Sequence, residues 1–377
     1  MNHFFARHLY LVDFTVASLG RRRGRNLGLF AVYVLLVFVL ASVSLMTHGL
    51  RREAQAILES SPEIVVQRMI AGRNDPVPTG AVAAITGIRG VRAVQGRLWG
   101  YYYDAGMRAN YTLMVPPDRP VESGAVVIGG GIARLRQLDT GDIVHFMAPD
   151  GRIVRFTVSG TLDSASELVS ADLVLMNEGD FRAFFGFPAD RFTDVVASVR
   201  NPREVGTVAS KIALALPEAR VVTRADMLRT YEALFDWRGG MVAVVLSGAV
   251  LAFVILAWDK AAGLSADERR EIGVLKAIGW ETSDVIAVKF WEGALVSLLA
   301  FLAGYVLAYG HVFYFSGALF EPALKGWAIL YPRFRLVPEI NGQQVATIFF
   351  FTVVPYTLAT IFPIWRAATI DPDTVMR

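Results

Sequence analysis

Four long apolar runs with almost no charge divide this chain. Three of them, Leu27 to Thr47, Met241 to Trp258 and Val345 to Trp365, carry no charged residue over about twenty positions. The fourth, Gly293 to Phe315, contains only His311 as a potential charge. About twenty helical residues cross the ~30 Å hydrocarbon core of a bilayer. The pattern therefore predicts a membrane protein with four transmembrane α-helices, at residues 27–48, 239–258, 293–315 and 345–365.

The first apolar run has a second interpretation, as the core of a cleaved signal peptide. The small residues Ala41, Ser42 and Ser44 near its end suit that interpretation. The run is too long for such a core, and the preceding residues 1–26 are too many for a typical basic leader, so we favour a retained anchor. Residues 1–26 also mix aromatic and aliphatic side chains with a basic end, which predicts an amphipathic helix in the membrane interface.

Basic residues around the first run predict the orientation. Four arginines precede it and two follow it: Arg21, Arg22, Arg23 and Arg25 before, Arg51 and Arg52 after. Since positive charge accumulates on the cytoplasmic side, both termini are expected in the cytoplasm of a cell whose inner membrane the chain spans. The remaining segments are then an extracytoplasmic domain at 49–238, a cytoplasmic loop at 259–292, an outer loop at 316–344 and a cytoplasmic tail at 366–377.

Within the extracytoplasmic segment, short strand and helix patterns alternate. Val126 to Ile128 reads as a buried strand and Ile132 to Leu138 as a short helix. Ile143 to Met147 and Arg152 to Val158 read as a hairpin around a Pro-Asp-Gly turn. Because polar and apolar residues alternate in the second of these strands, the sheet should be wet on one face. The segment is expected to form an α+β domain.

Two features of this domain leave alternatives open. Gly129, Gly130 and Gly131 follow a strand, but neither the dinucleotide pattern nor a P-loop lysine is complete, so a tight strand-to-helix turn is favoured over a phosphate site. One aromatic set either packs into the core or forms an apolar contact surface: Trp99, Tyr101, Tyr102, Tyr103 and Tyr111. Core packing is the favoured interpretation.

Composition narrows the class of function. Hydrophobic residues make up 54% of the chain and charged residues 19%, and the net charge is only +3. Residues 51–238 hold as many acidic as basic side chains, which argues against a nucleic-acid partner. With no cysteine in the sequence, disulfides and thiolate metal sites are excluded. Hydrolase and metal-helix motifs are missing, so we expect no catalytic residue, no metal site and no cofactor held by this chain.

A charged interruption between the second and third runs, Ala266 to Asp284, is here called the polar segment. Ser265 followed by Glu268 is a capping-box pattern, which predicts a helix from Ala266. Gly279 is placed to end it in the left-handed conformation. Ile272, Leu275 and Ile278 are expected to share an apolar side. A second cap within 282–284 should start a helix that runs unbroken into the third span. The alternative interpretation of the polar segment is an ordinary solvent-exposed connector without a partner.

The polar segment resembles the cytoplasmic coupling segment of ABC-transporter permeases of the FtsX-like, MacB-type family, which includes lipoprotein-releasing permeases. The resemblance lies in "ERREIGVLKAIGW", with Trp280 where the family more often has a small residue. The residues expected to couple to an ATPase are Glu268, Arg269, Arg270, Glu271, Ile272, Gly273, Leu275, Lys276 and Gly279. The tail "PIWRAATIDPDTVMR" also resembles the family's ending, and its motif residues are Asp371, Pro372 and Arg377.

This resemblance implies a permease that is not itself an enzyme. Two copies of a separate ATPase subunit would bind ATP and Mg²⁺, and a second permease, identical or homologous, would pair with this chain. Closure of the ATPases would be relayed to the extracytoplasmic domain, a mechanism called mechanotransmission. A periplasmic adaptor or a lipoprotein is a further candidate partner, besides membrane lipids.

Two functions compete within that family. The first is ATP-driven extraction or export of a lipoprotein, lipid, peptide or other amphiphile at the outer face. The second is an FtsX-like signalling or scaffold role that regulates a cell-wall hydrolase without a transported substrate. Under either function, charge reversal at Glu268 or Glu271 is expected to uncouple ATP hydrolysis from the work done outside.

Overall fold

The computed structural model divides the chain into two compact units. It describes residues 2–21, 23–59, 61–162, 167, 169–231, 266–320, 329–330 and 336–368, and also 233, 240, 244, 247–248, 250–251, 254–255 and 258. The first unit contains residues 1–49, 236–318 and 337–377, and the second contains residues 50–235 and 319–336.

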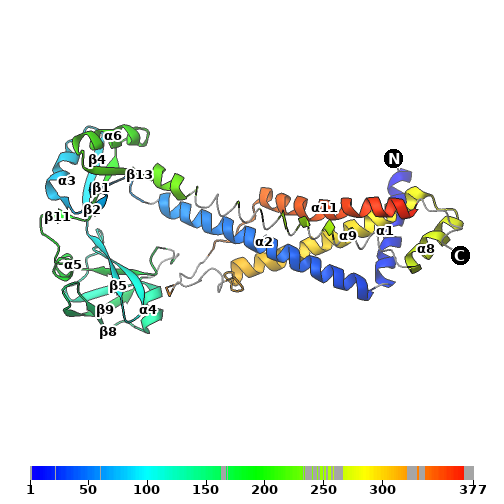
Figure 1. Ribbon diagram of the computed structural model, residues 1–377, viewed down its shortest axis with the longest axis horizontal. Helices are drawn as coiled ribbons and strands as arrows, with labels where there is room; N and C mark the ends of the chain where they lie inside the picture. The colour runs from blue at the N-terminus through cyan, green and yellow to red at the C-terminus, as the bar shows by residue number, and fades with distance from the viewer. Residues whose placement is uncertain are drawn as a thin grey trace. The chain divides into compact units, whose positions relative to one another are not determined.

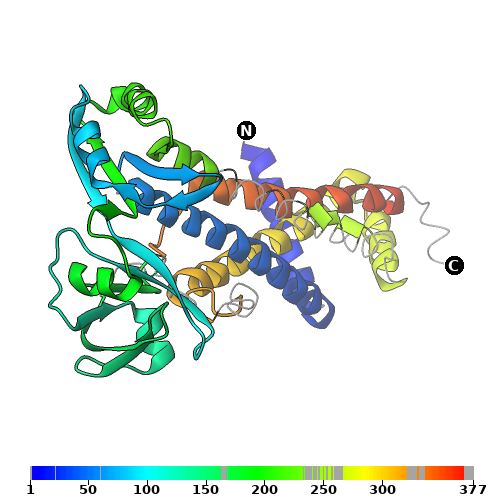
Figure 2. The same ribbon diagram turned by 60° about the vertical axis from the view of Figure 1, so that its left-hand side comes forward.

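Helices build the first unit. They are α1 (Asn2–Arg21), α2 (Arg23–Glu59), α8 (Ala266–Ala277), α9 (Thr282–Tyr309) and α11 (Gly342–Ala368). Helix α9 lies beside α11 and is crossed by α2 in both views, and α1 lies across α9 (Figure 1, Figure 2). A helix that crosses a bundle in this way suits the predicted interfacial position of the N-terminal segment.

Two helices in the described part of the chain are long and apolar enough to cross a bilayer. They extend over Leu27–Glu59 and Thr282–Tyr314. The segment predicted to span at 345–365 lies inside the continuous helix α11. Most of the segment predicted at 239–258 lies outside the described residues. The chain therefore has at least these two membrane-spanning candidates, and the count of four stays a prediction.

The first helix does not end with its apolar run. Hydropathy predicts an end near residue 48, but α2 continues for about three more turns to Glu59. The residues from Arg51 to Glu59 are mostly strong helix formers, and no glycine or proline interrupts them before Pro62. Hydropathy marks where a chain prefers lipid, whereas backbone propensity decides where a helix stops.

Small and polar residues join the long helices. A Cβ added at Gly304 of α9 would lie only 2.8 Å from the carbonyl oxygen of Val34 in α2, so the two backbones approach closely. The Gln344 amide of α11 donates to Ser44 Oγ of α2 at 2.8 Å. The His311 side chain is buried, and its Nδ1 lies 3.2 Å from Ser42 Oγ of α2. A hydrophobicity profile shows depth along a helix and does not reveal such a partner.

The second unit is an α+β structure with two main sheets. The first sheet has the order β13–β1–β12–β4, with β2 on the end of β1, and every pair is antiparallel. Its strands are β1 (Ile64–Ile70), β2 (Arg73–Asp75), β4 (Val91–Arg97), β12 (Asp194–Val199) and β13 (Ala219–Thr223). Two helices, α3 (Thr79–Thr86) and α6 (Val205–Ala215), contribute Ile85 and Ile212 to its core.

The second sheet is mixed, with the order β5–β6–β10–β7–β9–β8. Parallel pairing occurs between β6 and β10 and between β7 and β9. Its strands are β5 (Trp99–Asp104), β6 (Ala109–Met114), β7 (Ala125–Ile128), β8 (Ile143–Met147), β9 (Ile153–Thr161) and β10 (Leu173–Met176). The short helices are α4 (Gly130–Arg136) and α5 (Glu178–Phe185), and a two-stranded sheet joins β3 (Val77–Pro78) to β11 (Arg191–Phe192). The predicted hairpin corresponds to β8 and β9.

The aromatic residues of β5 are divided between the two faces of the strand. Tyr102 packs against the core of the second sheet, whereas Tyr101 and Tyr103 are exposed. Neighbouring strand residues point to opposite faces, so a run of tyrosines cannot be wholly buried in a sheet with one wet face. Core packing, the favoured interpretation, holds for every second residue.

The three consecutive glycines form a turn that backbone packing explains. Gly129 is the N-cap of α4, and a Cβ there would lie 2.0 Å from the Ser170 carbonyl oxygen. A Cβ at Gly131 would lie 2.7 Å from the Ala171 carbonyl oxygen. Any side chain at either position would collide with backbone, so the glycines are needed for the strand-to-helix turn.

A charged cluster lies beside the hydrophobic core of the second sheet, to which Tyr111 belongs. The carboxylate of Asp104 accepts hydrogen bonds from the guanidinium of Arg136 and from the Tyr111 hydroxyl. Burial raises the pKa of Asp104, but the bonds from Arg136 and the Met107 amide outweigh it and leave the pKa below its ordinary value. Burial also raises the pKa of Tyr111 to about 12. The Asp104 carboxyl is thus held ionised, as an acceptor, and the Tyr111 hydroxyl is held protonated, as a donor.

Candidate functional site

The polar segment folds as two helices joined by a tight turn. Helix α8 begins at Ala266 and ends at Ala277. Gly279 has φ +101°, and the Trp280 amide donates to the Leu275 carbonyl at 3.0 Å, which is the bond of a Schellman motif. The glycine is required here because the left-handed conformation is costly for other residues. The predicted helix end at Gly279 is thus present.

Helix α9 begins with a reciprocal cap. The side chain of Glu281 accepts from the Asp284 amide, and the Asp284 carboxylate accepts from the Glu281 amide at 3.2 Å. The cap therefore begins one residue before the predicted 282–284 window. From Thr282 the helix runs without a break to Tyr309, through the predicted third span. A displacement of its first turn would move a rigid rod.

The two helices pack against each other through a small apolar contact. Ile272 of α8 and Val285 of α9 are both buried and touch. Gly273 is also buried. Ile278 was expected on the same side as Ile272, but it is 69% exposed. A spacing of six residues turns a helix by about 240° from the starting direction, so these two side chains point apart.

The outward face of α8 is apolar at its centre. Val274 is 49% exposed and Ile278 is 69% exposed. Arg270 is exposed one turn before Val274, on the same side of the helix. Val274 and Ile278 therefore add apolar surface that the described part of the chain does not cover. The face, defined by Arg270, Val274 and Ile278, is here called the outward face.

Helix α1 holds the start of α9 from the other side. The Arg7 guanidinium lies 2.5 Å from Asp284 Oδ1, the cap residue of α9. The bond to Asp284 raises the pKa of Arg7 above its ordinary value, so the guanidinium stays charged. The Trp291 indole donates to His8 Nδ1 at 3.3 Å. Charged and aromatic contacts thus join α1 to the first turns of α9.

An aromatic pair connects α1 to the turn itself. The rings of Phe14 and Trp280 have centroids 5.2 Å apart at an interplanar angle of 50°. The neighbouring Thr15 is buried, and its hydroxyl lies 3.4 Å from the Val288 carbonyl oxygen. Trp280, the residue that departs from the family pattern, is therefore the one that packs on α1. We call the contacts of Arg7, His8, Phe14 and Thr15 with α9 and its turn the α1 clamp.

The structure separates the sequence-predicted residues by their exposure. Ile272 and Gly273 are buried in the helix pair, while Glu271, Leu275 and Lys276 are partly exposed. Arg270 lies on the outward face, and the side chains of Glu268 and Arg269 lie outside the described residues. The C-terminal motif residues Asp371, Pro372 and Arg377 also lie outside them.

Sequence reasoning missed Val274 and the α1 clamp. Val274 was missed because an apolar residue inside a helix reads as core. The clamp joins positions separated by more than 260 residues, as in the Arg7–Asp284 bond, and no local pattern carries such a pairing. Among the residues that the structure describes, no group of three or more His, Asp or Glu side chains could hold a metal ion.

Comparisons with known proteins match part of the helical unit to a family model. Residues 239–372 match the model of the FtsX-like permease C-terminal family. A LolC protein of the lipoprotein-releasing system, from Xylella fastidiosa strain Temecula1, is 23% identical over 270 residues, which cover 67% of this chain and 64% of the relative. An uncharacterised ABC transporter permease of Methanocaldococcus jannaschii is 20% identical over 269 residues, covering 67% of this chain and 62% of the relative. The matched part of the chain thus covers less than two thirds of the length of each of these relatives.

Two solved structures resemble parts of the chain more distantly. One is the extracellular domain of the transporter YknZ from Gram-positive bacteria, with 14% identity, a TM-score of 0.31, and coverage of 42% of this chain and 99% of that one. The other is the periplasmic region of MacB from Actinobacillus actinomycetemcomitans, with 8% identity, a TM-score of 0.32, and coverage of 45% and 92%. At TM-scores this low, the likeness adds nothing to the α+β architecture. The resemblance predicted from the polar segment and the tail is confirmed by the family match.

Proposed function

We propose, on the premise that residues 239–372 are an FtsX-like permease region, that this chain is the membrane subunit of an ABC transporter. A separate ATPase subunit would dock on the polar segment, and a second permease would complete the assembly. ATP and Mg²⁺ would be bound by the ATPase, and this chain would supply no catalytic group. The chain would lie in the inner membrane with both termini in the cytoplasm.

One observation carries the proposal: the outward face of α8 is joined to a membrane helix by a single turn. Val274 and Ile278 present apolar surface to a partner, and Arg270 offers a charge beside it. An apolar surface with an arginine beside it is compatible with the core of a protein–protein contact, which is more apolar than the rest of the surface and enriched in arginine. A solvated connector would have no use for either aliphatic side chain.

Transmission would then follow from rigidity. The Schellman turn and the reciprocal cap fix α8 to α9, and the α1 clamp fixes the other side of the same cap. Movement of α8 by a closing ATPase would tilt α9 as a rod, with α1 sliding in the interface. Leu9, Tyr10 and Val16 of α1 are exposed and apolar, which suits contact with lipid.

The work would be done at the outer face. Within the described helices, the ion pairs Arg7–Asp284 and Lys289–Glu292 lie before the predicted third span, which begins at residue 293. The α+β unit is large, so it is the natural place to handle a lipoprotein, lipid, peptide or other amphiphile. A lipoprotein, as in the lipoprotein-releasing system named for one relative, is an example of such a cargo.

Purification of the tagged full-length chain from native membranes tests the proposal. We expect an ATP-binding subunit with a P-loop to copurify, and the isolated chain to hydrolyse no ATP. A copurifying lipid or lipoprotein would support transport. A copurifying cell-wall hydrolase that the chain activates would replace transport with the regulatory alternative. ATP hydrolysis by the chain alone would overturn the assignment.

The α1 clamp supplies a further prediction. Phe14→Ala should lower ATP-dependent activity outside the membrane by roughly two- to tenfold while the ATPase subunit stays bound. An aromatic pair contributes about 0.5–1.5 kcal/mol beyond its burial, which converts to that range. Arg7→Gln should have the smaller effect, because Arg7 is exposed and such ion pairs contribute little.

Two assays check this prediction together: copurification of the ATPase, and activity per ATP hydrolysed. Leu9→Ala is the matched control, since Leu9 is an exposed apolar residue of the same helix. If Phe14→Ala and Leu9→Ala behave alike, the clamp has no part in transmission.

A further inference from the structure

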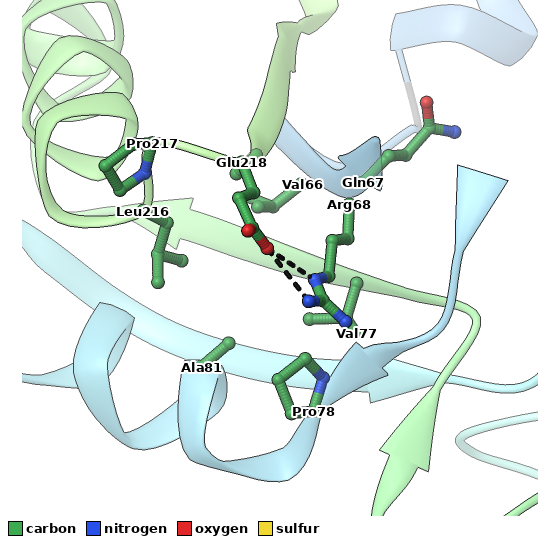
Figure 3. Close-up of a pocket in the computed structure, with 10 residues that line it drawn as sticks. Val66, Gln67, Arg68, Val77, Pro78, Ala81, Leu216, Pro217 and Glu218 are labelled. Carbon is green, nitrogen blue, oxygen red and sulfur yellow. Dashed lines mark hydrogen bonds and ion pairs between the residues drawn. The ribbon is translucent and has the colours of Figure 1, made fainter. Parts of the chain in front are cut away.

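A pocket of about 390 Å³ opens at one end of the first sheet in the α+β unit (Figure 3). It lies where β1, β3 and α3 meet the chain between α6 and β13. The lining residues are Val66, Gln67, Arg68, Val77, Pro78, Ala81, Leu216, Pro217, Glu218 and Ala219. Pockets that hold small ligands have volumes of about 300–1,000 Å³, so this one is large enough for a single chain or ring.

The walls of the pocket continue the hydrophobic core. Val66, Val77 and Ala81 are buried members of the core of the first sheet, and Leu216 and Ala219 pack partly buried against it. Seven of the ten lining residues are aliphatic or proline. A cavity with such walls favours apolar groups over water.

An ion pair meets across these walls. In Figure 3 the side chains of Arg68 and Glu218 point toward each other, while Gln67 points away. Arg68 Nε donates to Glu218 Oε2 at 2.9 Å, and Arg68 Nη1 donates to Asp75 Oδ2 at 2.5 Å. Arg191 reaches the same Asp75 oxygen at 3.3 Å. Two guanidinium groups and two carboxylates thus form one network.

The two carboxylates of this network differ in how firmly they are held. The Asp75 carboxylate forms ion pairs with both Arg68 and Arg191, and its side chain is 35% exposed. Among the described residues, the Glu218 carboxylate pairs only with Arg68, and its side chain is 64% exposed. An exposed glutamate loses little by turning into water, because water replaces the ion pair at small cost. Glu218 is therefore the replaceable partner of Arg68.

We propose that this pocket binds an amphiphile with one anionic head and an apolar chain. The carboxylate or phosphate of the ligand takes the place of Glu218 on Arg68, and the chain lies between Val77, Ala81 and Leu216. A cationic head is disfavoured, since it would have to compete with Arg68 for carboxylates that already hold it. Charge-assisted bonds to a guanidinium set the choice of head, and the apolar walls set the choice of tail.

This inference deepens the proposed function, and only its place in a transport cycle rests on that function. Binding itself needs no ATPase and no second permease. A failure of binding therefore leaves the permease assignment intact, and a failure of the permease assignment leaves the pocket. In a transport cycle, the pocket would hold the acyl or fatty-acid part of a cargo at the outer face.

The lack of cysteine in the sequence provides a direct test. A single cysteine introduced by Leu216→Cys lines the pocket, and one introduced by Leu214→Cys, at a position 82% exposed on α6, is the matched control. The full-length chain in lipid nanodiscs is treated with an uncharged water-soluble thiol reagent. Octanoate, octylamine and octanol are the probes. We expect octanoate to slow modification at position 216 several-fold, and octylamine and octanol to slow it much less.

Two variants in the L216C chain separate head recognition from simple filling. Arg68→Gln should weaken protection by octanoate about tenfold, because it removes a charge-assisted bond. Glu218→Gln, at an exposed position that folding tolerates, should strengthen protection because it removes the competing carboxylate. Equal protection by all three probes, equal protection at position 214, or weaker protection in Glu218→Gln would each overturn the proposal.

Discussion

Val274→Asp and Ile278→Asp are each expected to weaken association with the ATPase subunit by ten- to a hundredfold. Burying one aliphatic side chain contributes about 1.5–3 kcal/mol, and about 1.4 kcal/mol corresponds to a factor of ten. Both side chains are exposed in the chain alone and so have that surface to bury against a partner. An added carboxylate in the contact would also have to be desolvated. The measurement is the affinity of the purified ATPase for the full-length chain in nanodiscs.

Controls decide whether a loss of affinity belongs to the outward face. Val274→Thr keeps the shape without a charge and should lose less than Val274→Asp. Leu214→Asp makes the same kind of change on the exposed side of α6 and should leave ATPase affinity unchanged. Helicity measured by circular dichroism should be the same in all variants. Full affinity in both aspartate variants would remove the outward face from the docking site.

The outward face is a cleaner target than the glutamates of the polar segment. Charge reversal at Glu271 is expected to uncouple, but Glu271 is partly buried beside the helix pair, and a lysine there would also disturb α8 itself. Val274 and Ile278 point away from the chain, so their substitution leaves the Ile272–Val285 contact in place.

Arg97→Met is expected to lower the free energy of local opening around β4 and β12 by about 3–5 kcal/mol. The Asp194 side chain is 1% exposed and accepts from Arg97 Nε at 2.7 Å, from Arg97 Nη2 at 2.6 Å and from the Trp99 indole at 3.0 Å. Removal of the Arg97 guanidinium leaves the buried Asp194 carboxylate with only the neutral Trp99 indole among these three donors. A methionine fills the volume but cannot compensate the charge.

Hydrogen exchange of the β4 and β12 amides in the full-length chain measures this opening. The matched control is Arg152→Met, which breaks a pair with Asp150 at 2.5 Å whose side chains are 63% and 50% exposed. That variant should leave exchange nearly unchanged, because water replaces the lost partner. If both variants accelerate exchange equally, burial does not set the strength of these pairs.

The two ion pairs also show what local sequence can reveal. Asp150 and Arg152 lie two residues apart in a turn, so their contact is visible in the sequence. Arg97 and Asp194 are separated by 97 positions, and they meet because β12 pairs antiparallel with β4, with Asp194 opposite Arg97. Sheet register, which depends on the whole domain, creates the second pair.

Local patterns were sufficient wherever a short-range force dominates. Hydropathy located the apolar runs, because transfer of a side chain into lipid depends on that side chain alone. Glycine at 279 located the end of α8, because the left-handed conformation excludes most other residues. The alternation of β9 located its wet face, and the family resemblance followed from contiguous residues of the polar segment.

The chain's sequence by itself determined the apolar runs, the polar segment and the glycine that ends α8, since each depends on neighbours in the chain. Only the tertiary structure decided that Ile278 faces outward while Ile272 is buried, that α1 clamps the cap of α9, and that His311 turns toward α2. Those outcomes depend on which surfaces meet after residues hundreds of positions apart come together, and a linear pattern does not contain that distance information.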